Sequence, residues 1–199
     1  MSKFMYITCL GFIIGLFAFY KPVFAQDSIK ISNFTLENAQ GQALSLDSLA
    51  GKKLTVVIFT SSHCSYAVQY KDRLISIYEK YRGKEVNFIA INSNDPSMSA
   101  RDSASRMQAI SGFPFPYLKD ADQRVAKMFH ATKTPEVVVL APREKNYNIA
   151  YRGMIDDNPL DVTLVKEPYL SNAIDSLLIN KKPLSSQTTL TGCNIKWIE

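Results

Sequence analysis

The 199-residue sequence has little cysteine and histidine, with three Cys and two His residues. Glycine and proline are also sparse, at eight and nine residues, and charged residues make up only 21% against 46% hydrophobic ones. This composition excludes a disordered chain, a collagen-like repeat and a polytopic membrane protein. A chain of this length is expected to form one globular domain with a core large enough to fold without several crosslinks.

Dense runs of lysine or arginine are also missing. The formal net charge is +5, but residues 1–25 contain two lysines and no acid, which leaves 21 basic and 18 acidic residues. Because this small surplus is spread along the chain, it gives no electrostatic case for nucleic-acid binding. We therefore expect no nucleic-acid partner.

The sequence has one long hydrophobic run, which lies at its N-terminus. Lys3 precedes it, and the run extends from residue 4 to residue 20 with Thr8 as its polar interruption. Val23 and Ala25 then match the positions that a signal peptidase reads, so we expect residues 1–25 to be a signal peptide. The run is short for a membrane span, and an uncleaved N-terminal anchor is the alternative. Either way, we expect an exported protein in the periplasm or another extracytoplasmic compartment.

Hydrophobic patterning predicts a βαβ unit in the first half of the mature chain. Residues 54–59 (LTVVIF) are almost all apolar or β-branched, as in a strand buried on both faces. Apolar residues then recur at spacings of three and four over residues 67–81, which predicts a helix ended by Gly83. A second strand over residues 86–91 should run parallel to the first.

The remaining segments extend this unit to an α/β fold with a mixed sheet between helices. The sequence predicts an N-terminal hairpin within residues 29–49 and a polar loop over 92–101. It also predicts short helices over 102–110 (capped by Asp102) and 121–129, strands over 136–140 and 147–151, and a last helix that begins at Pro168. The expected domain covers residues 26–180, and residues 181–199 form a polar, flexible-looking tail.

Cys64 is the best candidate for a reactive group. It follows the buried strand at the point where the first helix begins, so its sulfur should face unpaired backbone N–H groups and the positive end of the helix dipole. Both favour a thiolate, and we expect the pKa of the thiol to fall below the free value of about 8.5. A buried, inert cysteine is the alternative. The polar neighbours Ser61, Ser62, His63 and Ser65 argue against full burial.

Cysteine and histidine usage also limits the cofactors. Without Cys9 in the predicted signal peptide, the mature chain keeps Cys64 and Cys193, an even number that can pair in an oxidising compartment. His63 and His130 form no cluster with other histidines or cysteines, which argues against zinc. We therefore expect no metal site and no bound cofactor.

The motifs together resemble the thioredoxin fold in its redoxin branch. They are Phe59 followed by Cys64, the turn Thr134–Pro135 before a strand, residues 92–95 (NSND), residues 153–157 (GMIDD) and residues 192–197 (GCNIKW). The pattern is similar to exported, peroxiredoxin-like bacterial proteins of the alkyl-hydroperoxide-reductase/thiol-specific-antioxidant group and of the TlpA and ResA type. The resemblance covers residues 28–180 and implies a three-layer thioredoxin-like fold with an N-terminal hairpin and an inserted segment.

Two departures from these families affect the expected chemistry. Thioredoxins begin this helix with two cysteines three positions apart, but the second position holds Ala67. Peroxiredoxins place a proline where this chain has Val57, although Ser61 matches their Thr/Ser position. Their peroxide-activating arginine has no evident match beside Thr134–Pro135. Peroxidase chemistry is therefore the alternative, not the first expectation.

The resemblance implies roles for other residues near Cys64. It implies a cis peptide bond before Pro135, which would expose the backbone of Thr134 so that an extended partner chain could pair there. An ordinary trans proline at the start of a strand is the alternative. Ser61 and His63 are candidates for contact with the partner or the thiol, and Tyr66 for lining the entrance to it.

Cys193 leaves three interpretations open. It can be the resolving thiol that attacks a mixed disulfide on Cys64, a structural clasp that pins the tail with Ile195 and Trp197 in a groove, or an unpaired thiol far from Cys64. We accordingly expect a thiol-disulfide oxidoreductase acting on protein thiols or disulfides. The alternatives are a thiol peroxidase that reduces a small peroxide and a binding module without catalysis. A membrane contact is expected only through an uncleaved anchor.

Overall fold

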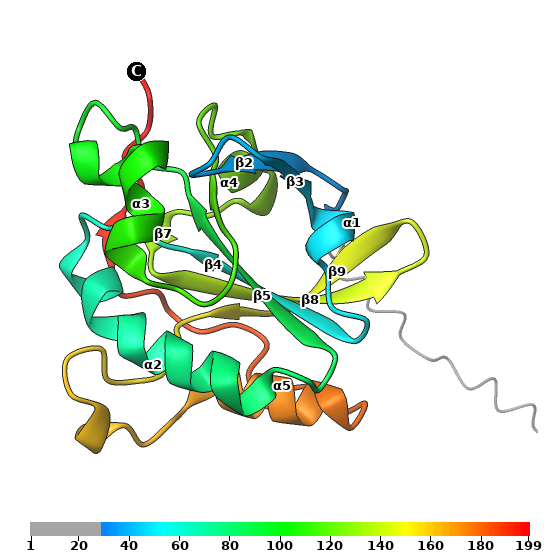
Figure 1. The fold of residues 1–199 in the computed structure, drawn as a ribbon. Coiled ribbons are helices and arrows are strands. Elements are labelled where there is room, and N and C mark those ends of the chain that lie inside the picture. The colour runs from blue at the N-terminus through cyan, green and yellow to red at the C-terminus, as the bar shows by residue number, and fades with distance from the viewer. Residues whose placement is uncertain (1–28) are drawn as a thin grey trace, which may run out of the picture.

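The computed structural model describes residues 29–199, and the signal peptide predicted for residues 1–25 lies outside this range. The described chain folds around one mixed sheet of eight strands in the order β1-β9-β8-β4-β5-β6-β2-β3 (Figure 1). The strands are β1 (Lys30–Ile31), β2 (Thr35–Asn38), β3 (Ala43–Ser45), β4 (Leu54–Phe59), β5 (Val86–Asn92), β6 (Tyr117–Lys119), β8 (Glu136–Arg143) and β9 (Asn146–Gly153).

The centre of the sheet is β4, whose six residues are all buried. It pairs in parallel with β5, from Leu54 opposite Val86 to Phe59 opposite Ile91, and antiparallel with β8. The unbroken β-branched and apolar pattern predicted this position, because a strand covered on both faces has no solvent-facing side. The βαβ unit and the antiparallel β8–β9 hairpin are both confirmed.

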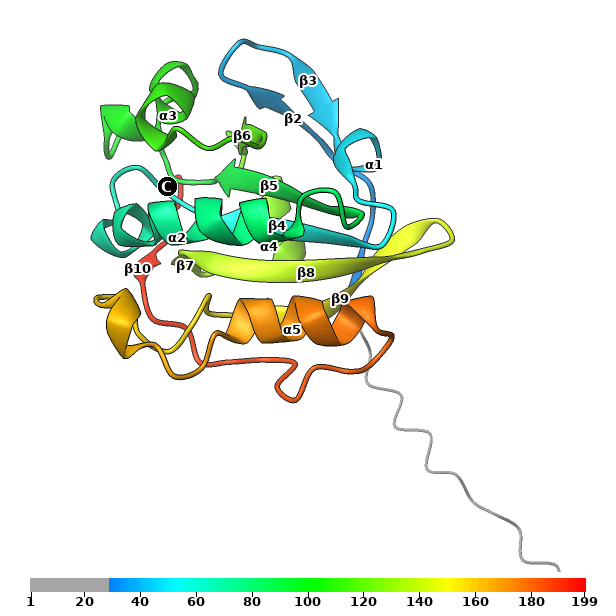
Figure 2. The ribbon, with the colours of Figure 1, turned by 60° about the horizontal axis from the view of Figure 1, so that its bottom comes forward.

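Helices cover both faces of the sheet, which confirms the predicted three-layer fold. One face packs against α2 (Ser65–Tyr81), α3 (Ala104–Ser111) and α5 (Tyr169–Leu178), and Figure 2 shows α2 and α5 running alongside the central strands. The other face packs against α1 (Leu46–Leu49) and α4 (Arg124–Phe129). Among residues 29–199, no helix has the length and hydrophobicity that crossing a bilayer would need.

Three helix starts differ from the sequence predictions. Asp102 does not cap α3, because it lies in the short 3-10 helix η1 (Ala100–Asp102) and its carboxylate turns toward the strand ends. Helix α4 begins three residues later than expected, since Gln123 has a left-handed backbone with φ of 59°. Pro168 is the N-cap of α5, one position before the first helical residue.

The C-terminal tail, which the sequence predicts to be flexible, is packed along the domain. Arg152 forms a parallel bridge with Gln187, and the Thr188 hydroxyl accepts a hydrogen bond from the Met154 N–H. Strand β10 (Cys193–Asn194) then pairs with β7 (Lys133–Thr134), and Ile195 is buried in the core on the α4 side. These contacts bring β10 to the start of α2 (Figure 2). Cys193 thereby lies beside Cys64.

Candidate functional site at the Cys64–Cys193 disulfide

Cys64 is the N-cap residue of α2, directly after the turn that follows β4. Its backbone is extended, with φ of −79° and ψ of 122°, and its carbonyl accepts the first helical hydrogen bond, from the Val68 N–H at 3.0 Å. No side chain caps this helix end. The first-turn N–H groups therefore remain available to stabilise negative charge on a thiolate.

A disulfide joins Cys64 to Cys193, although 129 residues separate them. Their Cα atoms lie 5.9 Å apart, within the usual range for a disulfide. The interpretation of Cys193 as an unpaired thiol far from Cys64 is therefore wrong. A resolving thiol and a structural clasp both need the pair, and both interpretations remain. Cys64 is only 2% exposed in this disulfide form, whereas Cys193 is half-buried. The sequence expectation that polar neighbours would keep Cys64 exposed is wrong for the oxidised protein.

The backbone of Thr134 lies against the disulfide. The Sγ atom of Cys64 is 3.1 Å from the Thr134 carbonyl oxygen. A disulfide sulfur has no hydrogen to donate, so this is a contact in the oxidised form, and it becomes a possible hydrogen bond once Cys64 is a thiol. In the dithiol form, the carbonyl would favour the protonated thiol while the N–H groups of α2 favour the thiolate.

The peptide bond between Thr134 and Pro135 is cis, as the resemblance implies. The predicted use of this cis bond is to let an extended partner chain pair with Thr134. The structure shows that the protein's own tail occupies this edge, since Cys193 is paired antiparallel with Thr134 and Asn194 with Lys133. A partner strand at the same edge would have to displace β10.

The remaining predicted site residues divide between surface and interior. His63 is exposed and Tyr66 is half-buried in the first turn of α2, so both lie near Cys64 where a partner could reach them. Ser61 is instead buried, and its hydroxyl donates to the Asp102 carboxylate and accepts from the His63 N–H. Ser61 therefore shapes the turn before Cys64 from within, and its contact with a partner stays a prediction.

Asp102 is the main site residue that the sequence analysis missed. Its buried carboxylate accepts hydrogen bonds from four groups, which are the Ser61 hydroxyl, the Ser62 N–H and the side-chain amides of Asn92 and Asn94. Residues 92–95 stood out as a motif, but no local pattern tied them to Asp102, because these contacts join three separate segments.

Lys119 supplies a positive charge near the buried Asp102 carboxylate. Its ammonium donates to the Asn92 side-chain oxygen and the Asn94 carbonyl. Burial lowers the pKa of Lys119, and the nearby carboxylates of Asp102, Asp120 and Asp95 oppose this shift. The charged form is thus compensated by its neighbours, as a buried cation requires.

A buried ion pair holds the turn that carries Thr134. Glu136 accepts a hydrogen bond from the Thr132 N–H and pairs with Arg152 at 3.3 Å. Burial raises the pKa of Glu136, and the Thr132 N–H and Arg152 oppose that shift. These contacts fix residues 132–136 against β9 and so fix the edge that faces the disulfide.

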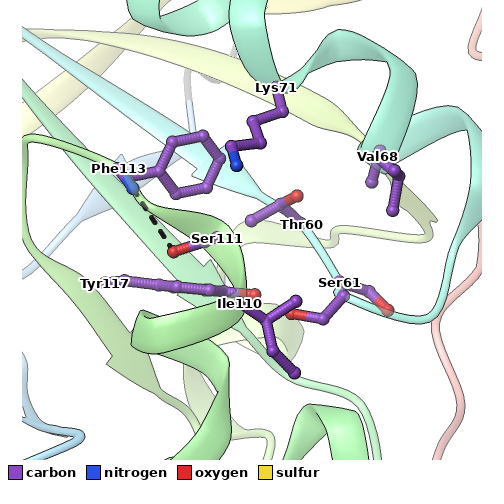
Figure 3. A pocket seen from close by; sticks show the side chains of 10 residues that line it. Thr60, Ser61, Val68, Lys71, Ile110, Ser111, Phe113 and Tyr117 are labelled. Atoms are coloured by element: carbon purple, nitrogen blue, oxygen red, sulfur yellow. Dashed lines mark hydrogen bonds between the residues drawn. The ribbon is translucent and has the colours of Figure 1, made fainter.

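A small hollow lies beside the turn before Cys64, between α2 and α3 (Figure 3). Its volume is about 130 Å³. Thr60 and Ser61 form part of its wall, Val68 and Ile110 expose apolar side chains to solvent, and Lys71 contributes a cationic group. The hollow offers a mainly apolar contact surface near the reactive turn.

Within residues 29–199, no three side chains of the metal-ligating types come together. A pair of cysteines, one of them at a helix start, can exchange disulfides with another thiol.

The mixed sheet, the helices on both faces and a cysteine at the start of the first crossover helix define a thioredoxin-fold protein. The model of the AhpC/TSA family matches residues 29–157. The chain belongs to the AhpC/TSA family.

Two solved structures share 31% sequence identity with this chain and have TM-scores of 0.77. One is a hypothetical protein of Sinorhizobium meliloti, with 86% of this chain and 94% of that chain covered. The other is an uncharacterized conserved protein of Geobacillus kaustophilus, with 86% and 92% covered. The thiol-disulfide oxidoreductase ResA of Halalkalibacterium halodurans is 23% identical over 145 residues, which cover 70% of this chain and 80% of ResA. These similarities support a redoxin and leave the reaction to be argued from the site.

Proposed function

We propose that this protein is an exported thiol-disulfide oxidoreductase with Cys64 as its nucleophile and Cys193 as its resolving thiol. The observation that carries the proposal is the disulfide between a helix N-cap and a tail strand, which replaces the missing second cysteine at Ala67. The named relative ResA supports the same reaction class.

In the proposed reaction, the dithiol protein reduces a disulfide in a partner. The Cys64 thiolate attacks one partner sulfur, which forms a mixed disulfide and releases the other partner sulfur as a thiolate. The Cys193 thiolate then attacks Cys64 Sγ, which forms the Cys64–Cys193 disulfide and releases the second partner thiolate. Two electrons pass from the protein to the partner, and an external dithiol restores the reduced form.

Access to Cys64 depends on redox state in this mechanism. Cys64 is covered in the disulfide form, and the tail strand occupies the edge beside it. Breaking the S–S bond frees the Cys193 side chain to turn away and uncover Cys64. His63 and Tyr66, together with the rim of the hollow between α2 and α3, then offer the surface for a partner protein.

The first test is reduction of insulin with dithiothreitol as the electron donor. We expect the wild-type protein to accelerate this reduction and Cys64→Ser to lower the rate to the uncatalysed background, because the attacking sulfur is lost. Cys193→Ser should accumulate a mixed disulfide on Cys64 that mass spectrometry detects. A wild-type rate in Cys64→Ser would contradict the assignment of the nucleophile.

Peroxide reduction is the second candidate, and membership of the AhpC/TSA family favours it. The Cys64 thiolate would attack the peroxide, become a sulfenic acid and release water or an alcohol. Condensation with Cys193 would then release water and form the same disulfide. Rapid peroxide consumption by the reduced protein, with a sulfenic acid trapped on Cys64 in Cys193→Ser, would favour this reaction over disulfide exchange.

The proposed export depends on the N-terminal sequence, which lies outside the described residues. A lysine, a hydrophobic run and small residues near position 25 support removal of residues 1–25. The mature protein recovered from cells should then begin at Gln26. A protein that keeps residues 1–25 in the membrane fraction would support the anchor instead.

A further inference from the structure

A path of hydrogen bonds connects the two chain segments that carry the disulfide without passing through either sulfur. It begins at the Ser62 N–H, two residues before Cys64, and ends at the Lys196 N–H, three residues after Cys193. Asp102 and Asn94 lie between these ends. Their side chains bond to each other, with Asn94 Nδ2 donating to Asp102 Oδ2 at 3.1 Å.

Asp102 holds the end of the path that leads to Cys64. Its Oδ1 atom accepts from the Ser62 N–H at 3.0 Å, and its carboxylate also accepts from the Ser61 hydroxyl. The residue is 1% exposed, so water does not compete for these bonds. A buried carboxylate with several donors is a strong anchor, because leaving any donor unpaired would cost free energy.

Asn94 holds the end that leads to Cys193. Its Oδ1 atom accepts from the Lys196 N–H at 2.9 Å, and the residue is 4% exposed. Gln123 fixes the same part of the tail, because its Nε2 donates to the Lys196 carbonyl at 2.8 Å and its Oε1 accepts from the Ile198 N–H at 2.9 Å. The Asp95 N–H also donates to the Lys196 carbonyl.

We propose that Asn94 and Asp102 are positioning residues that keep the backbone of Cys193 next to Cys64 while the disulfide is open. The bonds of this path involve no sulfur, so reduction leaves them intact, and the burial of Ile195 adds an apolar anchor to the same tail. Asn94 is the link, since its two side-chain atoms bind the tail and Asp102 separately.

The proposal rests on the proposed function and assigns residues to its resolving step. In that step, the Cys193 thiolate attacks Cys64 Sγ in a mixed disulfide and expels the partner thiolate. Because both cysteines belong to one chain, this attack is unimolecular, and holding Cys193 beside Cys64 makes it fast. A tail that came loose on reduction would instead have to search for Cys64 before each resolution.

The test follows the reaction of the reduced protein with dithiobis-nitrobenzoate, an aromatic disulfide that releases coloured nitrothiobenzoate. Attack by Cys64 releases a first nitrothiobenzoate at a rate that depends on reagent concentration. Attack by Cys193 on the mixed disulfide releases a second nitrothiobenzoate at a rate that is independent of reagent concentration. Stopped-flow absorbance separates the two phases. Cys193→Ser should show only the first phase, which assigns the second phase to Cys193.

Asn94→Ala is expected to slow the second phase about tenfold, which corresponds to about 1.4 kcal/mol, the range for lost hydrogen bonds. The first phase should stay within about twofold of wild type, a split that a general loss of stability would not produce. Gln123→Asn should slow the second phase in the same direction. Asparagine tolerates the left-handed backbone of position 123 but is too short to hold the tail.

The matched control is Asn87→Ala, at the other end of β5, where the side-chain amide donates to the Leu49 carbonyl far from the tail. It should leave both phases unchanged. The proposal is overturned if Gln123→Asn and a folded Asn94→Ala both keep the wild-type second phase. If Asn94→Ala fails to fold, Gln123→Asn alone decides. Absence of the first phase in the wild-type protein would instead contradict the proposed function itself.

Discussion

Replacing Gly192 with valine is expected to leave Cys64 and Cys193 as two free thiols under conditions that oxidise the wild-type protein. A Cβ atom at position 192 would lie 2.4 Å from the Thr134 carbonyl oxygen and 3.0 Å from its carbon. Both are backbone atoms of the turn that ends in Pro135, so neither can move aside as a side chain would. Strand β10 then cannot pair with β7 in its present register, and Cys193 is held away from Cys64.

The expected loss of stability follows from the size of the loop that the disulfide closes. With a sequence separation of 129 between the cysteines, the chain-entropy estimate gives about 4–5 kcal/mol. For a domain of this size, that loss lowers the melting temperature by about 10 °C or more. Thiol titration and thermal unfolding of the oxidised proteins measure the two effects.

Two variants separate the steric effect of valine from other causes. Cys193→Ser removes the crosslink alone, so its stability loss should be no larger than that of Gly192→Val, which also loses the pairing of β10 with β7. Gly41→Ala also replaces a glycine with positive φ, but a Cβ there would meet nothing within 4 Å, so its disulfide should form normally. A fully formed disulfide in Gly192→Val would show that β10 can pair in another way.

Arg73→Met is expected to destabilise the protein by about 3–5 kcal/mol, since it leaves the buried Asp156 without its cation. The Arg73 guanidinium lies 2.6 Å from the Asp156 carboxylate, and their side chains are 13% and 3% exposed. Tyr70 also donates to Asp156 at 2.8 Å, and burial together with this bond raises the pKa of Tyr70. One hydroxyl cannot replace the lost positive charge. Urea unfolding of both proteins measures the difference.

Lys80→Met on the same helix is the matched control. Lys80 pairs with Asp175 at 3.0 Å, but both side chains are about half exposed, so water screens the pair. Such surface pairs contribute at most about 1 kcal/mol. Equal destabilisation by the two substitutions would contradict the view that burial gives the Arg73–Asp156 pair its large effect.

The sequence predicted the central fold because burial there follows simple periodic patterns. Strand β4 shows the unbroken apolar run of a strand covered on both faces, and α2 shows apolar residues on one face. The same patterns placed Cys64 at the start of α2. Each of these features depends on residues that are close together in the sequence, so local reasoning could find them.

The pairing of the tail with β7 and the hydrogen bonds around Asp102 could not be predicted from local patterns. Strand β10 has only two residues, which is too short for a hydrophobic pattern in the sequence. Its pairing depends on main-chain hydrogen bonds, which do not depend on the kind of side chain. Asp102 looked like a helix cap because a short polar side chain before a helix usually acts locally. Its actual partners lie 8 to 41 residues away in the sequence, and only the folded chain brings them together.

The long separation of the two cysteines means that oxidation closes most of the domain into one covalent ring. The disulfide stabilises the folded protein relative to the unfolded one. Because a thermodynamic cycle must close, folding favours formation of the disulfide by the same free energy. Neighbouring cysteines on one helix would close a ring of only a few residues, and this linkage would be weak. Here, a substitution far from either sulfur that unfolds the reduced protein should also make the bond easier to reduce, because the unfolded chain no longer holds the two sulfurs together.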